Sequence, residues 1–139
     1  MSNTWTPITN PDNPLHGKNY EEVMAAVREN GFALRYVRDQ TPEICMAAVR
    51  ENGLTLQYVR EQTPEICLAA VQQTDYALQY VRDQTPEICM AAVEQNGLTL
   101  LYVHEQTPEI CLAAVQQTGY ALQYVHDDLY KEVTAAIQR

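Results

Sequence analysis

The stretch YVREQTPEICLAAV, residues 58–71, decides the fold, because close copies of it begin at Tyr36, Tyr80 and Tyr102, at intervals of 22 residues. A fixed period of this length is the signature of a repeat architecture, in which each unit forms one small element of structure. In this register five units span residues 19–40, 41–62, 63–84, 85–106 and 107–128, followed by a half unit, residues 129–139. Residues 1–18 form a Pro-rich arm before the repeats.

Each unit carries the signals for two short helices. In the second unit, Thr41 is suited to cap a helix N-terminus, Pro42 to occupy the first turn and Glu43 to meet the positive end of the helix dipole. Asn52-Gly53 is expected to end this helix after about 11 residues, and residues 54–61 to form a second helix of about 8 residues. Each unit is therefore predicted to be a helical hairpin.

Both predicted helices have wide apolar faces. On a helical wheel the second unit forms these faces from Ile44, Cys45, Ala48, Val49, Leu54, Leu56, Tyr58 and Val59. A lone hairpin could not bury so much apolar surface, so neighbouring hairpins must stack and share one core. We therefore predict an all-α fold, an α-solenoid of stacked short helical hairpins with one hairpin per 22-residue repeat. The arm with Trp5 and the half unit with Arg139 are expected to cover its two ends.

The core of the unit, Tyr-Val-x-x-Gln-Thr-Pro-Glu-Ile-Cys, resembles a bacterial family of short tandem helical repeats that is known only as a domain of unknown function. The resemblance covers residues 19–139, although the first unit has Asn19-Tyr20-Glu21-Glu22-Val23 in place of Thr-Pro-Glu-Ile-Cys. It implies a helical array and no particular activity. No functional residue is therefore carried over from the family.

Composition and charge disfavour several classes of function. The 139 residues contain 18 Asp and Glu but 9 Lys and Arg, and the resulting net charge of -9 disfavours direct binding to nucleic acid. No apolar run is long enough to span a bilayer, and residues 1–5 lack the features of a signal peptide. We therefore expect a cytoplasmic protein without a membrane partner. The charge is uneven, since residues 83–139 hold 8 acids and 2 bases.

One cysteine recurs in each of four successive units, at Cys45, Cys67, Cys89 and Cys111. Packed helices lie about 8–10 Å apart, too far for a disulfide between equivalent positions, and no C-x-x-C pair indicates zinc. The end units place Val23 and Val133 at this position. We therefore expect buried packing residues and neither a metal nor another cofactor.

Two rows of repeated residues are candidates for contact with a partner. A polar row on the second predicted helix has a simple alternative explanation as a solvated helix end, and it consists of Arg60, Glu61, Arg82, Asp83, His104, Glu105, His126 and Asp127. A second row forms either the rim of the core or an open apolar stripe, and it consists of Met46, Leu68, Met90 and Leu112. The change from Arg to His in the later units suggests that the acidic end meets a basic partner or responds to mild acid.

The tyrosine that recurs in every unit is a further candidate for an exposed binding strip. The wheel places it inside the apolar face, so we expect core positions with the hydroxyl group at the surface for Tyr36, Tyr58, Tyr80, Tyr102 and Tyr124.

The sequence offers little for catalysis. Ser2 is the only serine, and no triad, phosphate loop or metal motif is present, so we expect a protein that is not an enzyme. Helical arrays mostly present an extended surface to another protein, so the first hypothesis is a protein-binding module, with self-association as one form of it. One alternative is an acidic inhibitor that imitates nucleic acid, although about two carboxylates per unit fall short of the charge density of DNA. Another is a bacterial effector that binds a host protein.

Overall fold

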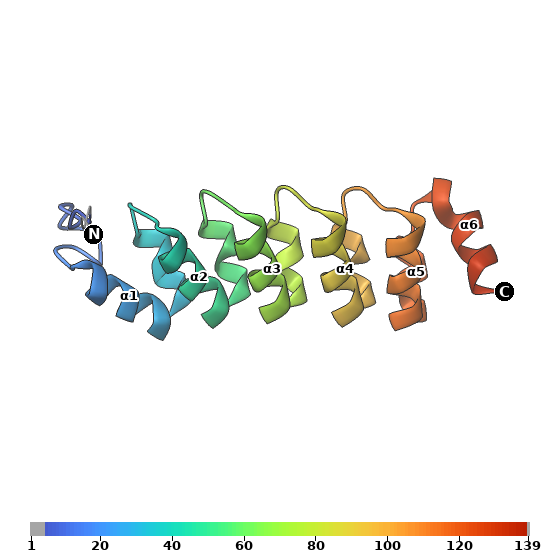
Figure 1. Cartoon of the computed structure of the whole chain (residues 1–139), viewed down its shortest axis with the longest axis horizontal. Coiled ribbons are helices and arrows are strands. Elements are labelled where there is room, and N and C mark those ends of the chain that lie inside the picture. Colours follow the sequence, from blue (N-terminus) through green and yellow to red (C-terminus); the bar gives the residue numbers. More distant parts are fainter. Residues whose placement is uncertain (1–4, 139) are drawn as a thin grey trace.

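The computed structural model describes residues 5–138, which form an α-solenoid: helix pairs follow one another along a single axis, with the N-terminal arm at one end and the last helix at the other (Figure 1). Residues 1–4 and Arg139, which belong to the two predicted end caps, lie outside the described part of the chain. Each repeat unit is termed a rung. Among the described residues, no helix is long and apolar enough to cross a membrane.

Every rung pairs one α-helix with one short 3-10 helix, labelled η. The α-helices are α1 Tyr20–Glu29, α2 Pro42–Glu51, α3 Pro64–Gln73, α4 Pro86–Gln95, α5 Pro108–Gln117 and α6 Asp127–Ile137. The 3-10 helices are η1 Gly31–Tyr36, η2 Gly53–Tyr58, η3 Asp75–Tyr80, η4 Gly97–Tyr102 and η5 Gly119–Tyr124. The predicted all-α solenoid with one hairpin per 22 residues is confirmed.

The α-helices begin where the sequence predicts. Thr41 adopts an extended backbone conformation, and its hydroxyl oxygen accepts a hydrogen bond from the backbone N–H of Ile44 at 3.2 Å. Pro42 follows in the first turn, where its missing N–H leaves no backbone bond unmade. In the first rung Asn19 and Glu22 form a reciprocal capping box instead, with bonds of 2.8 and 3.0 Å.

The second helix differs from its prediction in type and length. It is a 3-10 helix of six residues, Gly53–Tyr58, and residues 59–61, which were expected to continue it, lie outside any helix. Asn52 caps this helix, because it adopts an extended conformation and its side-chain oxygen accepts from the Leu54 N–H at 3.0 Å. Thr74 and Thr118 adopt an extended conformation at the same position of the third and fifth rungs without a side-chain cap bond. Val59 ends the helix by donating its N–H to Leu56 and then turning into an extended conformation.

One apolar core runs through all rungs. Its largest members are equivalent leucines of the 3-10 helices, and Leu34, Leu56, Leu78 and Leu100 are each 0% exposed. Full burial of such a side chain stabilises the fold by about 1.5–3 kcal/mol, so each rung depends on its neighbours to exclude water. The repeated tyrosines pack against this core but remain half-buried, so their predicted core position is correct only in part.

Rungs approach one another most closely at glycines. A Cβ atom added to Gly53 would lie 2.3 Å from the backbone oxygen of Ala70, and one added to Gly97 would lie 2.2 Å from that of Ala114. The Gly53 N–H also donates to Gln73 Oε1 of the next rung at 2.6 Å. These positions therefore admit no side chain without a shift of the backbone.

The N-terminal arm packs on the first rung. Ile8 and Leu15 are each 4% exposed, and the Trp5 ring meets the Tyr20 ring edge-on at 5.6 Å. Asn13 Nδ2 donates to the Tyr36 carbonyl at 2.9 Å. At the opposite end, α6 begins at Asp127 without a Thr-Pro cap, and it contributes Val133 to the core.

Candidate functional site

Seven of the eight residues of the polar row lie in the segments that follow the 3-10 helices, and the eighth, Asp127, begins α6. Arg60 follows the end of η2 by two residues, and Arg82 follows the end of η3 in the same way. The prediction that the row occupies the second helix is therefore wrong. The segments that join each 3-10 helix to the next α-helix form one side of the solenoid, termed the loop edge, and comprise residues 37–41, 59–63, 81–85, 103–107 and 125–126.

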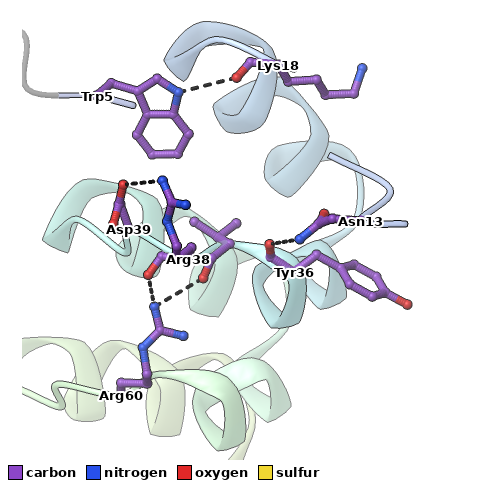
Figure 2. A network of polar contacts seen from close by, with 8 residues as sticks. Trp5, Asn13, Lys18, Tyr36, Arg38, Asp39 and Arg60 are labelled. Carbon is purple, nitrogen blue, oxygen red and sulfur yellow. Dashed lines mark hydrogen bonds and ion pairs between the residues drawn. The ribbon is translucent and has the colours of Figure 1, made fainter. Parts of the chain in front are cut away.

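Arg60 and Arg82 bind the preceding rung through the loop edge. Arg60 Nη2 donates to the backbone carbonyl of Val37 at 3.2 Å and also to the carbonyl of Arg38, as Figure 2 shows. Arg82 Nη2 repeats the contact one rung later, at 3.4 Å from the Val59 carbonyl and 2.6 Å from the Arg60 carbonyl. These two guanidinium groups therefore join rungs, which the explanation of the row as a solvated helix end did not anticipate.

His104 and His126 hold the same positions in the fourth and fifth rungs, but neither makes this contact. The His104 backbone N–H donates to Gln84 Oε1 at 2.9 Å, while its ring Nε2 lies 3.4 Å from Gln84 Nε2. The His126 N–H makes the same backbone contact with Gln106. The loop edge thus changes its chemistry halfway along the array.

The acidic members of the polar row all face solvent. They are exposed at Glu61, Asp83, Glu105 and Asp127, and the last of these opens α6. Among residues 5–138 the single ion pair is Arg38 with Asp39, at 3.4 Å. The predicted acidic end is therefore a surface of carboxylates without basic neighbours bound to them.

A row of glutamines that was not predicted from the sequence joins successive rungs. Gln40 Nε2 donates to the carbonyl of Tyr58 at 2.8 Å, and its Oε1 accepts from the backbone N–H of Arg60 at 3.1 Å and from the Cys45 thiol at 3.6 Å. The same three contacts recur at Gln62, Gln84 and Gln106. The signal that could have found them is the replacement of this glutamine by Asp128 in the last complete unit.

Two equivalent grooves open along the loop edge. One has a volume of about 350 Å³ and is lined by Arg38, Gln40, Pro42, Cys45, Arg60, Glu61, Thr63 and Ile66. The other, of about 260 Å³, lies two units later and is lined by Arg82, Asp83, Gln84, Pro86, Cys89, His104, Glu105, Thr107 and Ile110. The structure therefore brings four of the predicted partner-binding residues, Arg82, Asp83, His104 and Glu105, into one groove.

The row of Met46, Leu68, Met90 and Leu112 is half-buried on the α-helices. Its first-rung counterpart, Met24, is 8% exposed and shares with Met46 a groove of about 660 Å³ between α1 and α2. Leu68 lines a groove of about 420 Å³ between α3 and α4. The row is thus both the rim of the core and the floor of shallow grooves.

Exposed large apolar side chains occur on the 3-10 helices of the last three rungs and on α6, where they are Tyr130 and Ile137. Tyr76 on η3 is 53% exposed, Leu101 on η4 is 48% exposed and Tyr120 on η5 is 78% exposed. Sequence analysis did not single them out. The signal for Leu101 is that the second, third and fifth units have a glutamine at the equivalent position, Gln57, Gln79 and Gln123.

The four cysteines are free and buried, as the packing interpretation predicts. Burial raises the pKa of the Cys45 thiol to about 11, and burial, with a smaller contribution from Asp128, raises the pKa of Cys111 to about 11. Burial also raises the pKa values of Cys67 and Cys89. Because the thiolate is the reactive form, these groups are poor nucleophiles and poor metal ligands at neutral pH.

The described residues contain no assembled cation site. Nowhere between Trp5 and Gln138 do three His, Cys, Asp or Glu side chains come close enough together to hold a metal ion. The arrangement offers chemistry of recognition: exposed carboxylates on the loop edge, apolar side chains on the 3-10 helices and shallow grooves between the α-helices.

Comparison with known proteins identifies the repeat. The model of a family described as Domain of unknown function (DUF4116) matches residues 19–63, 41–85, 63–107 and 85–130. Each match spans two rungs, and successive matches advance by one unit of 22 residues. Neither a curated protein nor a solved structure matches the chain.

Proposed function

The chain belongs to the DUF4116 family, a family of repeats of unknown function, and from this premise we propose that it is a protein-binding module, not an enzyme, which presents an extended surface to a protein partner. The proposal places it in a reducing compartment such as the cytoplasm, where free cysteines persist.

Leu101 is the observation that carries this proposal. It lies 48% exposed on η4, although the equivalent residues Gln57, Gln79 and Gln123 are polar. Large exposed apolar residues that cluster on a surface mark interaction sites, and aromatic residues are enriched in the buried cores of interfaces. Tyr76 and Tyr120 on the adjacent 3-10 helices supply such aromatic neighbours.

The predicted partner-binding rows extend this surface. The half-buried Met46, Leu68, Met90 and Leu112 supply adaptable apolar contacts on the α-helices. On the loop edge, the exposed Asp83, Glu105 and Asp127 would attract a partner with a positively charged surface. Arg60 and Arg82 contribute less directly, because their guanidinium groups already bind carbonyls of the chain.

A second candidate is an acidic inhibitor that occupies the nucleic-acid groove of an enzyme. The observation in its favour is the surface of exposed carboxylates in residues 83–139, where acids outnumber bases by 8 to 2. A bacterial effector that binds a host protein is a special case of the leading proposal. Salt separates the two classes, because imitation of phosphates by charge loses affinity steeply as salt rises, whereas contacts through Leu101 do not.

Affinity capture with the intact array tests the proposal. We expect a partner that wild-type bait retains at moderate salt and that Leu101→Gln bait loses, since this change restores the polar residue of the other rungs. Gln57→Leu, at the equivalent exposed position of the second rung, is the matched control and should retain the partner. Equal capture by wild-type and Leu101→Gln bait contradicts a role for this surface, and loss of the partner by salt alone favours the acidic inhibitor.

A further inference from the structure

A ladder of arginine side chains on backbone carbonyls stops halfway along the loop edge. Arg60 donates to the carbonyls of Val37 and Arg38 (Figure 2), and Arg82 donates to those of Val59 and Arg60. Each pair of neighbouring carbonyls at the end of a 3-10 helix therefore accepts one guanidinium group from the following rung. At two junctions, therefore, a guanidinium group is the ligand of these carbonyls.

The next two carbonyl pairs have no arginine to bind. They belong to Val81 with Arg82 and to Val103 with His104, and the residues that follow one rung later are His104 and His126. Within the part of the chain that the structure describes, no side chain donates a hydrogen bond to these four carbonyls. The His104 ring lies beside the Gln84 amide instead, because an imidazole is shorter than the side chain of arginine.

Arg82, the exposed member of the first pair, lines a groove with an acidic rim. The volume of the groove is about 260 Å³, and its lining also includes Asp83, His104 and Glu105. The Arg82 guanidinium is directed to the preceding rung, and neither carboxylate forms an ion pair among the described residues. A cationic side chain that enters the groove therefore meets two carboxylates near the Arg82 backbone.

We infer that the backbone carbonyls of Arg82 and His104 each bind an arginine side chain of a partner protein, in the way that the carbonyls of Arg38 and Arg60 bind Arg60 and Arg82. These two residues are exposed, whereas Val81 and Val103, the other members of the two pairs, are buried. This inference rests on the proposed function as a protein-binding module and names the chemistry of its partner. Arginine fits better than lysine, because its planar group offers several donors in a fixed fork to neighbouring acceptors.

The spacing of the two sites sets the spacing of the arginines. Sites on adjacent rungs lie about 8–10 Å apart, the usual separation of packed helices. In a polyproline II segment every third side chain points the same way, and three residues span about 9 Å. The favoured ligand is therefore an extended segment with the pattern Arg-x-x-Arg.

The direct test is binding of a synthetic peptide that contains Arg-Pro-Pro-Arg, measured by calorimetry against the full chain. We expect binding by the wild type, and binding at least about tenfold weaker when both arginines are replaced by citrulline, which keeps the shape and removes the charge. The double variant His104→Arg/His126→Arg should place its own guanidinium groups on the open carbonyls, as Arg60 and Arg82 do, and should also bind at least about tenfold more weakly.

A matched control separates occupied carbonyls from added charge. Gln79→Arg/Gln123→Arg adds the same two charges at exposed positions on η3 and η5, away from the carbonyl pairs, and should weaken binding by less than about threefold. The inference is overturned if the wild type does not bind the peptide, if citrulline makes no difference, or if both double variants bind equally.

Failure of this inference and failure of the proposed function have different outcomes. If the captured partner depends on Leu101 but no variant of the loop edge affects its binding, the chain is a protein-binding module and the arginine sites are wrong. If the peptide binds as expected but Leu101→Gln bait captures as much partner as wild type, the arginine sites stand and the surface proposed around Leu101 is wrong.

Discussion

The second and third rungs form one half of the comparison, and the fourth and fifth rungs form the other. The two halves share one interior and differ at the surface. Residues 41–84 and 85–128 differ at seven of 44 positions, and none of the seven is buried in either copy. Both copies keep the Thr-Pro caps and the buried leucine of their first unit, Leu56 or Leu100. Gln62 and Gln106 hold the same place in the glutamine row, whereas Gln84 is replaced by Asp128. They differ in Arg60 against His104, Arg82 against His126 and Gln57 against Leu101. The two copies therefore share their buried residues and differ at side chains that are not buried, some of which contact a neighbouring rung.

Substitutions in the shared interior should have the largest effects on the free energy of unfolding, and these effects should be alike in both halves. Gly53→Ala and Gly97→Ala each force a Cβ atom to within 2.3 and 2.2 Å of a backbone oxygen, so each should lower the free energy of unfolding by about 2–4 kcal/mol. Urea denaturation checks this. Gly119→Ala meets nothing within 4 Å and should leave stability unchanged or slightly raised. A small loss at either junction glycine would show that the rungs are not packed this closely.

Single substitutions in the glutamine row compare the stability of a junction in one half with that of a junction in the other. Gln62→Ala and Gln84→Ala each remove hydrogen bonds to a tyrosine carbonyl, a backbone N–H and a thiol, and should cost about 1–3 kcal/mol. We expect the larger loss for Gln84, because Arg82 still joins the rungs at the Gln62 junction. Gln79→Ala, whose amide bonds only within its own helix, is the control. Equal losses at Gln62 and Gln84 would show that Arg82 does not compensate for the lost glutamine.

Removal of an arginine distinguishes the two halves directly, although its effect on the free energy of unfolding should be smaller than that of the glutamine substitutions. Arg82→Met keeps an unbranched apolar stem and removes the donors to the Val59 and Arg60 carbonyls, so it should lower the free energy of unfolding by about 1 kcal/mol. His126→Met removes no such contact and should change stability by less than about 0.5 kcal/mol. Differential scanning calorimetry of the pair measures the difference, and identical melting temperatures would refute it.

The last effect, which concerns the thiols, is absent at neutral pH and appears only at alkaline pH. The pKa of Cys45 is raised from 9.0 to about 11 in the folded chain, so its thiol ionises in the unfolded state first. The fold therefore loses stability as pH rises from about 9 to about 11, and is unaffected below that window. Cys45→Val, which copies the residue of the first rung at Val23, should reduce this loss. Parallel pH profiles of the wild type and the variant would contradict the assignment.

The sequence predicted the features that lie within one repeat and missed those that join two. Periodicity and the Thr41-Pro42 cap were sufficient for the register, the α-helices and the buried cysteines. Over six residues, a helical wheel does not distinguish a 3-10 helix from an α-helix, so the helix type predicted for residues 54–61 was wrong. The contacts of Arg60 and Gln40 cross to residues about one repeat away, and no wheel of a single helix contains that information.

The most direct test of the difference between the two halves exchanges their loop-edge residues. Urea unfolding should show that Arg60→His/Arg82→His lowers the free energy of unfolding by about 2 kcal/mol, at about 1 kcal/mol for each lost guanidinium contact. His104→Arg/His126→Arg should raise it by a similar amount, because the new guanidinium groups meet the open carbonyl pairs of Val81/Arg82 and Val103/His104. Opposite changes of this kind are the predicted result. Two variants as stable as the wild type would show that the arginines do not hold the rungs together.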